Sequence, residues 1–576
     1  MTYNLAPTTI INKYQTALAG YSKIVEFLQD QIKMKNKQKL TVVIECYPAT
    51  DLKELKENLI DPLKPQNIFM ADDYAMKPDK INNKIIDVIT DDRVLGVMSH
   101  YQVQDFYPDI KAISKEIKNL NGLTIVYGTG ATIITPKMDI LIYADLARWE
   151  IQLRYRSGLS NWQQDNASED VLRKFKRGYF FEWRIADRLK KRVLPESDFI
   201  LDTNIKNDPK LITSKDFFSG LKKLTTQPYR TVPYFDASVW GGTWMRKHFD
   251  LPDNGKNYGW AFDGVPEENS LYFKYGDVRI EVPAINLMLF YPEQILGTRV
   301  FSRFGSEFPI RFDYLDTMGG GNLSLQVHPL TEYINDKYGM SFTQDESYYI
   351  LDATDNSSVY LGLKENIDRK HLYTDLTAAR EGKKEFPDSE YVNRFPAKKH
   401  DHFLIPAGTI HCGGADTVVL EISATPYIFT FKMWDWGRVG LDGKPRPLHI
   451  DEGMDNLQDQ RDTVWVQDHL INKFSDISND SHEIVEKTGL HPELEFIQTN
   501  RHWINDFGTF KTYGSVNMLN MVEGETGVVE SVDNSFNSYE IHFGETFIVP
   551  ADIENYRIRN LTPDSGSIVI LQAFVK

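Results

Sequence analysis

Cysteine is scarce in this chain of 576 residues, since only Cys46 and Cys412 occur. Two cysteines exclude a disulfide framework, and their positions show no zinc-knuckle spacing, so the sequence favours a reducing compartment. Long apolar runs are also missing, because no stretch approaches about 18 consecutive apolar residues. The chain opens without a basic flank followed by a long apolar core. These absences predict a cytoplasmic protein with no membrane partner.

Positive charge is in deficit. Lysine and arginine number 65 against 81 aspartates and glutamates, which gives a net charge of −16. The chain as a whole therefore lacks the positive field that attracts nucleic acid, and no nucleic-acid partner is expected. A local basic pocket for a phosphorylated metabolite is compatible with this total. The apolar fraction of 41% is enough to build folded cores in several domains.

The pattern of predicted secondary structure changes once, near residue 225. Before that point apolar runs alternate with helical stretches, which predicts a parallel sheet in an α/β domain over residues 1–225. Beyond it, short strands separated by Gly, Pro, Asn and Asp predominate. They predict two β units of the sandwich or jelly-roll type, at 226–455 and 456–576. The apolar runs of the first domain lie at 40–46, 93–98, 123–127 and 138–143.

The N-terminal domain lacks a phosphate-binding loop. ECYPATDLKEL follows its first buried strand, where a P-loop kinase would carry a Gly-rich loop that ends in Lys and Ser or Thr. The Arg-rich helical segments farther on, DLARWEIQLRYR and FKRGYFFEWR, faintly resemble the lid of nucleoside kinases. This resemblance implies a kinase-like fold with a degenerate P-loop and little prospect of kinase activity. The sequence GTGAT at 128–132 fits an anion site or, more simply, a tight turn, so no cofactor-binding residues are assigned.

Four residues beyond the boundary have the side chains of a metal site. In LSLQVHP, Gln326 and His328 alternate along a strand, so both point to one face. Glu346 opens another predicted strand, and His411 follows the Pro-Gly turn of PAGTIHCGG. Imidazole and carboxylate ligands suit zinc, whereas the simpler alternative is that both histidines are packed polar residues of a sheet.

The segment from about 237 to 450 resembles the class I mannose-6-phosphate isomerases, which are zinc enzymes of the cupin superfamily. The resemblance implies one zinc ion per chain held by Gln326, His328, Glu346 and His411. It also implies an aldose–ketose isomerase that acts on a sugar phosphate through an enediol. The motifs that support it are VWGGT at 239–243, GWAFDGVPEENS at 259–270, LSLQVHP, PAGTIH, and WDWGRVGLDGKPRPLHI at 434–450.

Three positions depart from the family pattern. Lys432 stands where the family has an Arg, which keeps the charge but loses the planar fork that binds phosphate in two places. Gln344 replaces the Lys that the family usually has two residues before the glutamate ligand. The family also often has a Lys close to the phosphate in the stretch after the QxHP strand, and here Lys337 stands there only at a shifted position. Two explanations stay open: the pocket is rebuilt for the same substrate, or the protein acts on a different sugar or acts poorly.

Several other residues received a prediction. On the resemblance, Lys432 is assigned as catalytic, and His449 is a candidate for sugar contact or proton relay, although a histidine at a strand start is more often structural. His400 and His402, just before FLIPAGTIH, are candidates for groups that support the metal ligands, although a place at the surface is the favoured expectation. Cys412 should point away from His411 as a small core residue.

The C-terminal unit resembles the second cupin of the same family without its metal ligands. His542 stands alone there, so a structural packing role is expected for this unit. The prediction is therefore a zinc-dependent mannose-6-phosphate isomerase with a sugar phosphate as its small-molecule partner. A non-catalytic zinc-cupin sensor of sugars or sugar phosphates and an isomerase of a different sugar are the alternatives. The oligomeric state is left open.

Overall fold

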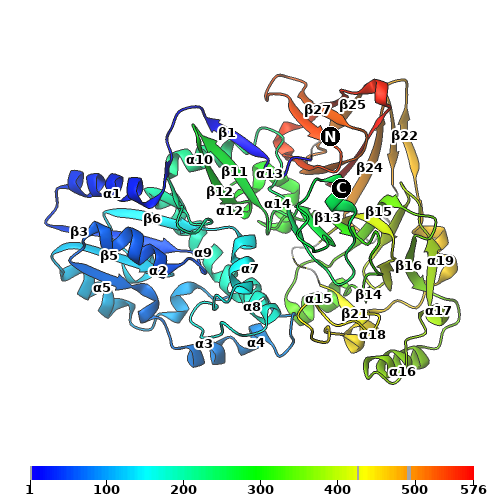
Figure 1. The fold of residues 1–576 in the computed structure, drawn as a ribbon, viewed down its shortest axis with the longest axis horizontal. Coiled ribbons are helices and arrows are strands. Elements are labelled where there is room, and N and C mark those ends of the chain that lie inside the picture. The colour runs from blue at the N-terminus through cyan, green and yellow to red at the C-terminus, as the bar shows by residue number, and fades with distance from the viewer. Residues whose placement is uncertain (1–2, 425–426, 428, 489–494) are drawn as a thin grey trace. The chain divides into compact units, whose positions relative to one another are not determined.

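The computed structural model describes residues 3–424, 427, 429–488 and 495–576 (Figure 1). The chain divides into two compact units. The α/β unit comprises residues 8–223 and 270–290. The β unit comprises the described parts of 1–7, 224–269 and 291–576. Within the described ranges, no helix is both long enough and apolar enough to cross a bilayer.

The α/β unit is built on a seven-stranded sheet with the order β2-β8-β7-β6-β3-β5-β4. Strand β3 pairs in parallel with both β5 and β6, and β4 and β7 extend the parallel part on either side. Its run LTVVIEC is buried on both faces, as expected for the centre of a parallel sheet. The strands are β2 (Leu18–Ala19), β3 (Lys39–Cys46), β4 (Asn67–Met70), β5 (Gly122–Gly128), β6 (Ile140–Asp145), β7 (Phe199–Asp202) and β8 (Lys210–Thr213).

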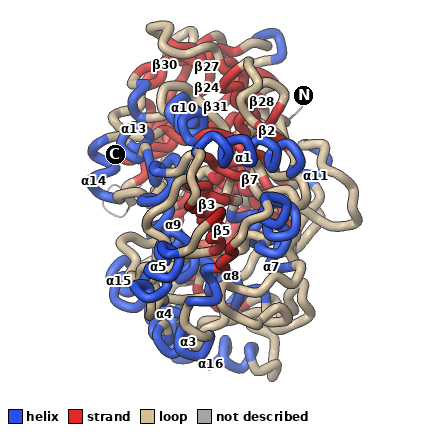
Figure 2. The backbone as a smooth tube through the Cα atoms, turned by 90° about the vertical axis from the view of Figure 1, so that its left-hand side faces the viewer, coloured by secondary structure: helices blue, strands red, loops and turns tan. Residues whose placement is uncertain are grey.

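Helices surround this sheet (Figure 2). Helix α1 packs Ile24 and Leu28 into the same core as Leu55 of α2, and these residues cover alternate side chains of β3 such as Val42 and Ile44. The helices of this unit are α1 (Tyr21–Lys35), α2 (Leu52–Leu55), α3 (Pro78–Lys84), α4 (Ile86–Ile89), α5 (Ile110–Asn119), α6 (Ala131–Ile134), α7 (Arg148–Arg156), α8 (Val171–Arg177), α9 (Trp183–Val193), α10 (Ser214–Leu224) and α12 (Ile285–Phe290).

The strand predicted at 93–98 is wrong. The segment carries no strand in the structure. The backbone N–H of Val97 donates to the carbonyl of Val88, and that of Ser99 to the carbonyl of Phe180, so these groups pair with helical segments rather than with a sheet. Because an apolar run shows burial but not its pairing partner, periodicity could not separate a buried loop from a strand here. The other three runs are β3, β5 and β6.

A second small sheet belongs to the α/β unit although most of it lies beyond residue 225. Strand β1 pairs in parallel with β11, which pairs with β12 in turn. Residues 270–290 thus pack with the first part of the chain rather than with the strands that flank them in sequence. The strands are β1 (Thr8–Asn12), β11 (Ser270–Tyr275) and β12 (Val278–Pro283).

The first part of the β unit consists of two antiparallel sheets, in the orders β18-β15-β20-β13-β10-β9 and β17-β16-β19-β14-β21. Their strands are β9 (Tyr234–Asp236), β10 (Trp260–Gly264), β13 (Arg311–Asp316), β14 (Leu325–Val327), β15 (Glu346–Ala353), β16 (Ser358–Leu363), β17 (Val392–Pro396), β18 (His402–Ile405), β19 (His411–Gly413), β20 (Thr417–Ser423) and β21 (Phe431–Trp434). The connecting helices are α11 (Trp244–His248), α13 (Pro292–Leu296), α14 (Thr298–Phe304), α15 (Thr331–Tyr338), α16 (Arg369–Arg380), α17 (Asp388–Tyr391), α18 (Ile450–Asn456) and α19 (Thr463–His469).

The last part of the chain is a second pair of antiparallel sheets, ordered β22-β23-β24-β31-β26-β29 and β25-β30-β27-β28. Apolar side chains from both sheets, such as Leu519, Phe547 and Ile558, form one buried core between them. The strands are β22 (Ser475–Asn479), β23 (Glu483–Lys487), β24 (Ile497–Ile504), β25 (Phe507–Lys511), β26 (Asn517–Glu523), β27 (Thr526–Ser531), β28 (Tyr539–His542), β29 (Thr546–Val549), β30 (Asn555–Asn560) and β31 (Ile568–Val575).

Each of these two pairs of facing sheets is a sandwich. A buried ion-pair network joins the two sandwiches of the β unit. Arg230, 4% exposed, places Nη2 3.2 Å from Asp263 of β10 and Nη1 2.6 Å from Glu545, which precedes β29. The backbone N–H of Thr546 also donates to Asp263 at 2.8 Å. One guanidinium thus pairs with a carboxylate from each sandwich, and Glu545 is also 3.3 Å from Nδ1 of His542.

Replacement of Arg230 by Met is expected to lower the free energy of unfolding of the β unit by about 3–5 kcal/mol, because Asp263 stays buried without its counter-charge and Glu545 keeps only His542 as an ion-pair partner. Chemical denaturation followed by tryptophan fluorescence measures the shift of the transition midpoint. Arg246→Met is the matched control, since Arg246 pairs with Asp253 near the surface, and such pairs contribute about 0–1 kcal/mol. Equal stability of the two variants would contradict the structural role of Arg230.

Candidate metal centre

Strand pairing brings the predicted ligands together from the two sheets of the first sandwich. Gln326 on β14 lies directly opposite His411 on β19, so the two side chains share one face of their sheet. His328 follows one residue after β14 ends, and Glu346 opens β15 in the facing sheet. The four side chains therefore meet between the two sheets.

The ligand atoms lie within reach of one ion. The Nε2 atoms of His328 and His411 are 3.1 Å and 2.8 Å from the two carboxylate oxygens of Glu346. The side-chain nitrogen of Gln326 is 3.2 Å from Nε2 of His411. His328, Glu346 and His411 form a buried group whose possible ligand atoms all lie within 4.8 Å of one another.

The second ring nitrogen of each histidine is already used. Nδ1–H of His328 donates to the carbonyl of Phe429 at 2.8 Å, and Nδ1–H of His411 donates to the carbonyl of Thr409 at 2.9 Å. These bonds hold both rings with Nε2 turned toward Glu346. Backbone partners of this kind orient metal-binding imidazoles in proteins.

The donor set fits a zinc ion. Nε2 of His328 and Oε1 of Glu346 are buried without a hydrogen-bond partner of adequate geometry, which is costly unless something else binds them. Ligand atoms around a tetrahedral zinc with bonds near 2.1 Å lie about 3.4 Å apart, and the spacings among these side chains are close to that value. Two imidazoles, one carboxylate and the Gln326 amide are ligand types that zinc accepts.

Gln344 holds the glutamate in place. Its side-chain N–H donates to Oε2 of Glu346 at 2.9 Å, and the residue is 3% exposed. The position where the related family has a Lys therefore carries a neutral group that orients the predicted ligand. No cation replaces that Lys at this point of the chain.

The local charges favour an ionised Glu346. Burial raises the pKa of its carboxyl, but the nearby imidazoles of His328 and His411 outweigh burial and hold the pKa well below its ordinary value. Burial by itself lowers the pKa of His328, and the charge of Glu346 reverses this and raises it. The centre is therefore already built around a negative carboxylate.

Lys432 lies beside the cluster. On β21 it is directly opposite Gln326, on the side away from His411, so His411, Gln326 and Lys432 form one row across three strands. His449 is buried and directly precedes α18 rather than a strand, and its backbone N–H donates to the carbonyl of Lys432 at 2.8 Å. The expectation that His449 starts a strand is wrong, because the segment turns into a helix there.

Other residues singled out in the sequence lie outside the cluster. Cys412 is fully buried and sits opposite Tyr360 on β16, one residue out of phase with His411. Lys337 is exposed on α15. His402 is 1% exposed on β18, so its predicted surface placement is wrong; burial lowers its pKa to about 3. The rings of Tyr349 and Phe474 lie beside its imidazole, with centroids 5.9 Å and 6.5 Å away.

The sequence reasoning missed a group of charges on the inner face of β13 and β20. Asp313 on β13 is opposite Glu421 on β20, and both are buried. Burial, followed by the charges of Asp313 and Glu346, raises the pKa of Glu421 well above its ordinary value. Arg311 bonds Asp313 at 3.1 Å, while its two Nη atoms are buried without partners. The sequence feature that could have revealed this group is Glu421, a glutamate inside the apolar run TVVLEIS.

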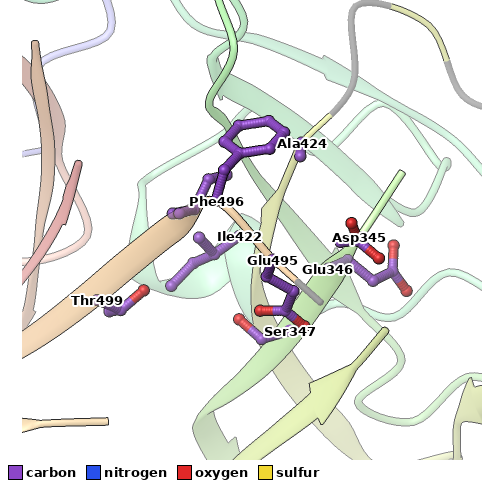
Figure 3. Close-up of a pocket in the computed structure, with 9 residues that line it drawn as sticks. Asp345, Glu346, Ser347, Ile422, Ala424, Glu495, Phe496 and Thr499 are labelled. Carbon is purple, nitrogen blue, oxygen red and sulfur yellow. The ribbon is translucent and has the colours of Figure 1, made fainter. Parts of the chain in front are cut away.

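A small cavity of about 10 Å³ lies behind Glu346 (Figure 3). Asp345, Glu495 and Thr499 contribute polar atoms to its wall, and Oε1 of Glu495 and Oγ1 of Thr499 are buried without partners. The volume is that of about one water molecule, which would satisfy these atoms.

In the α/β unit, backbone N–H groups of the GTGAT loop that could bind an anion are already bonded to a side chain of the same chain. The carboxylate of Glu45, at the end of β3, accepts from the backbone N–H of Gly130 at 2.6 Å and of Thr132 at 2.8 Å. Nearby, Lys190 pairs with Asp145 at 2.8 Å. The carboxyl ends of the central strands, where open α/β sheets place ligands, are thus occupied by internal polar contacts.

The site thus consists of two facing antiparallel sheets with a possible set of metal ligands between them. The chain is related in sequence to mannose-6-phosphate isomerases. It is 24% identical to Mannose-6-phosphate isomerase ManA of Bacillus subtilis over 241 residues, covering 41% of this chain and 69% of the relative. It is also 24% identical to Probable mannose-6-phosphate isomerase GmuF of the same organism over 339 residues, covering 58% and 96%.

Two further comparisons complete these findings. The crystal structure of the mannose 6-phosphate isomerase from Bacillus subtilis aligns with a TM-score of 0.48 at 19% identity, covering 60% of this chain and 99% of that one. Residues 20–226 match a family described as a domain of unknown function (DUF8485). The sequence relationships support an isomerase as the class of enzyme, whereas the kinase-like interpretation of the first domain stays a prediction.

Proposed function

We propose that the chain is a zinc-dependent aldose–ketose isomerase that interconverts mannose 6-phosphate and fructose 6-phosphate. One observation carries the proposal: a chain that is related in sequence to such isomerases holds a buried group of His328, Glu346 and His411 whose possible ligand atoms lie within 4.8 Å of one another. Gln326, His328, Glu346 and His411 are the proposed ligands of one zinc ion per chain. The proposed domains are 1–225, 226–455 and 456–576, with the metal in the middle one.

Zinc bound there would act as a Lewis acid on a sugar oxygen. The side chains around it have separable tasks. Gln344 keeps Glu346 oriented, and the backbone carbonyls behind His328 and His411 keep their rings turned to the centre. Lys432, in one row with Gln326 and His411, places a positive charge where an enediol develops negative charge. His449 is the proposed proton relay or sugar contact.

The charges around the centre favour a second candidate substrate. Gln344 is buried and neutral, and Lys337 is exposed on α15. Neither side chain places a cation beside the centre, and a phosphate dianion needs cations nearby to offset its charge. An isomerase of an unphosphorylated sugar is therefore the alternative, and it uses the same metal and the same proton transfer.

The test combines metal content with turnover. Purified full-length protein is expected to contain zinc, to interconvert the two sugar phosphates, and to lose activity with a chelator and regain it with zinc. Parallel assays with mannose and fructose decide between the two substrates. Zinc-loaded protein that binds a sugar phosphate without converting any sugar of the panel would instead identify a non-catalytic sensor and contradict the proposal.

A further inference from the structure

A polar pocket of about 290 Å³ lies in the α/β unit, away from the ends of the central strands. Three segments form its wall: α3 and α4, the loop that precedes α8, and α8 itself. Its lining includes three cations of α8, namely Arg173, Lys176 and Arg177, and one carboxylate, Glu169. Such a pocket is close in size to those that hold small molecules.

Lys176 forms no ion pair within 4.0 Å in the described part of the chain, although the carboxylates of Asp92, Glu169 and Asp91 are near enough to raise its pKa in part. The residue is 1% exposed, and its ammonium donates to the backbone carbonyls of Thr90 at 3.2 Å and of Asp92. The Asp92 carboxylate accepts instead from the backbone N–H groups of Val94 and Leu95. An ammonium has three donors, so one is left over. Burial, followed by the charge of Arg173, lowers the pKa of Lys176 to about 8, an effect that a bound anion would oppose.

Arg177 also has an unused donor. Its Nε lies 3.3 Å from Glu182 and its Nη1 bonds Asn82 at 2.9 Å, but Nη2 is buried without a partner. The residue is 8% exposed. A buried guanidinium N–H without an acceptor is costly, so an acceptor from a ligand would remove that cost. Arg173 adds an exposed guanidinium on the same helix, which donates to the carbonyl of Asp91 at 3.4 Å.

The rest of the wall suits an organic group. Asn82 and Gln164 bond each other at 3.1 Å and provide amide groups, while Ile85 and Ile89 are apolar. Glu169 is held by the side chain of Asn166 at 2.7 Å. Amide and apolar surfaces of this kind bind the hydroxyl groups and the carbon skeleton of a sugar or a nucleoside.

We propose that this pocket binds a small phosphate monoester, with its phosphate against Arg173, Lys176 and Arg177 and its organic part against α3 and α4. Phosphate has the acceptor oxygens that the unused donors require, and its negative charge neutralises Lys176. The site is independent of the metal centre and does not rest on the proposed isomerase activity.

Hydrogen exchange of the full-length, zinc-loaded protein tests the site, with inorganic phosphate, fructose 6-phosphate and AMP as probes. Phosphate is expected to slow exchange in peptides that cover 78–90 and 161–177. The better of the two organic phosphates should protect these peptides at lower concentration than inorganic phosphate, and it thereby shows whether the organic part is a sugar or a nucleoside. Absence of protection in both segments would overturn the site, and equal potency of all three probes would overturn the organic half of the proposal.

Variants assign the binding to the cations. Lys176→Met and Arg173→Met are each expected to weaken phosphate binding in calorimetry about 10- to 100-fold, the value of one charged hydrogen bond. Arg173 is exposed, so its variant should fold even if the Lys176 variant does not. Arg192→Met, an exposed arginine on α9 outside the pocket, is the control. Unchanged affinity in Arg173→Met would count against the proposal.

Discussion

The His411→Ala protein is expected to lose its metal and to lose activity by about 10³-fold or more, since a Lewis acid contributes several kcal/mol to such a reaction and each 1.4 kcal/mol or so is tenfold in rate. The physical reason is the geometry of the cluster. His411 is fully buried, lies 2.8 Å from Glu346, and presents an Nε2 that is oriented by the Thr409 carbonyl. Its removal leaves a void and an incomplete set of ligands, so the thermal midpoint should also fall.

Elemental analysis of the purified protein and a coupled isomerase assay measure the two effects. Cys412→Ala is the matched control, because Cys412 is the next residue on the same strand, equally buried, and turned to the opposite face. This control should retain its metal. Zinc content and activity that are unchanged in His411→Ala would rule out the proposed centre.

Lys432→Ala is expected to keep its metal and to lower kcat about 10²- to 10³-fold, the usual effect of removing one group that stabilises developing charge. Lys432 is next to Gln326 across the strand pair, but it is not one of the proposed ligands. The variant therefore separates binding of the metal from turnover. Lys432→Arg retains the charge and should recover most of the activity.

The same assays provide the comparison for Lys432. Lys370→Ala removes an exposed lysine of α16 and should leave both metal content and kcat unchanged. If Lys432→Ala turned over as fast as the wild type, the catalytic assignment of Lys432 would be wrong even with the metal in place. Loss of metal in Lys432→Ala would instead show a structural role.

Much of the candidate site could be predicted because its signals are local. The alternation in LSLQVHP places Gln326 and His328 on one face whatever the rest of the fold does. The same alternation excludes Cys412 as a metal ligand, because it points to the face opposite His411. Apolar runs located β3, β5 and β6 for a similar reason, since a strand buried on both faces must be apolar throughout.

The errors arose where pairing partners decide the outcome. Residues 93–98 are apolar, as a strand would be, but their backbone pairs with helical segments. His402 is polar, as a surface residue would be, yet it is buried beside the rings of Tyr349 and Phe474. The contacts of Ser99 with Phe180 and of His402 with Phe474 join residues far apart in sequence, so no local pattern could identify them.

By itself, the sequence determined which residue types could hold a metal and which of them share a strand face, because both follow from side-chain chemistry and the period of the backbone. Only the tertiary structure decided that Glu346 faces His328 and His411, that Lys432 is next to Gln326, and that α8 lines a pocket with three cations. These placements depend on strand register and packing between segments far apart in the chain, and such long-range contacts have no signature in any local stretch of sequence.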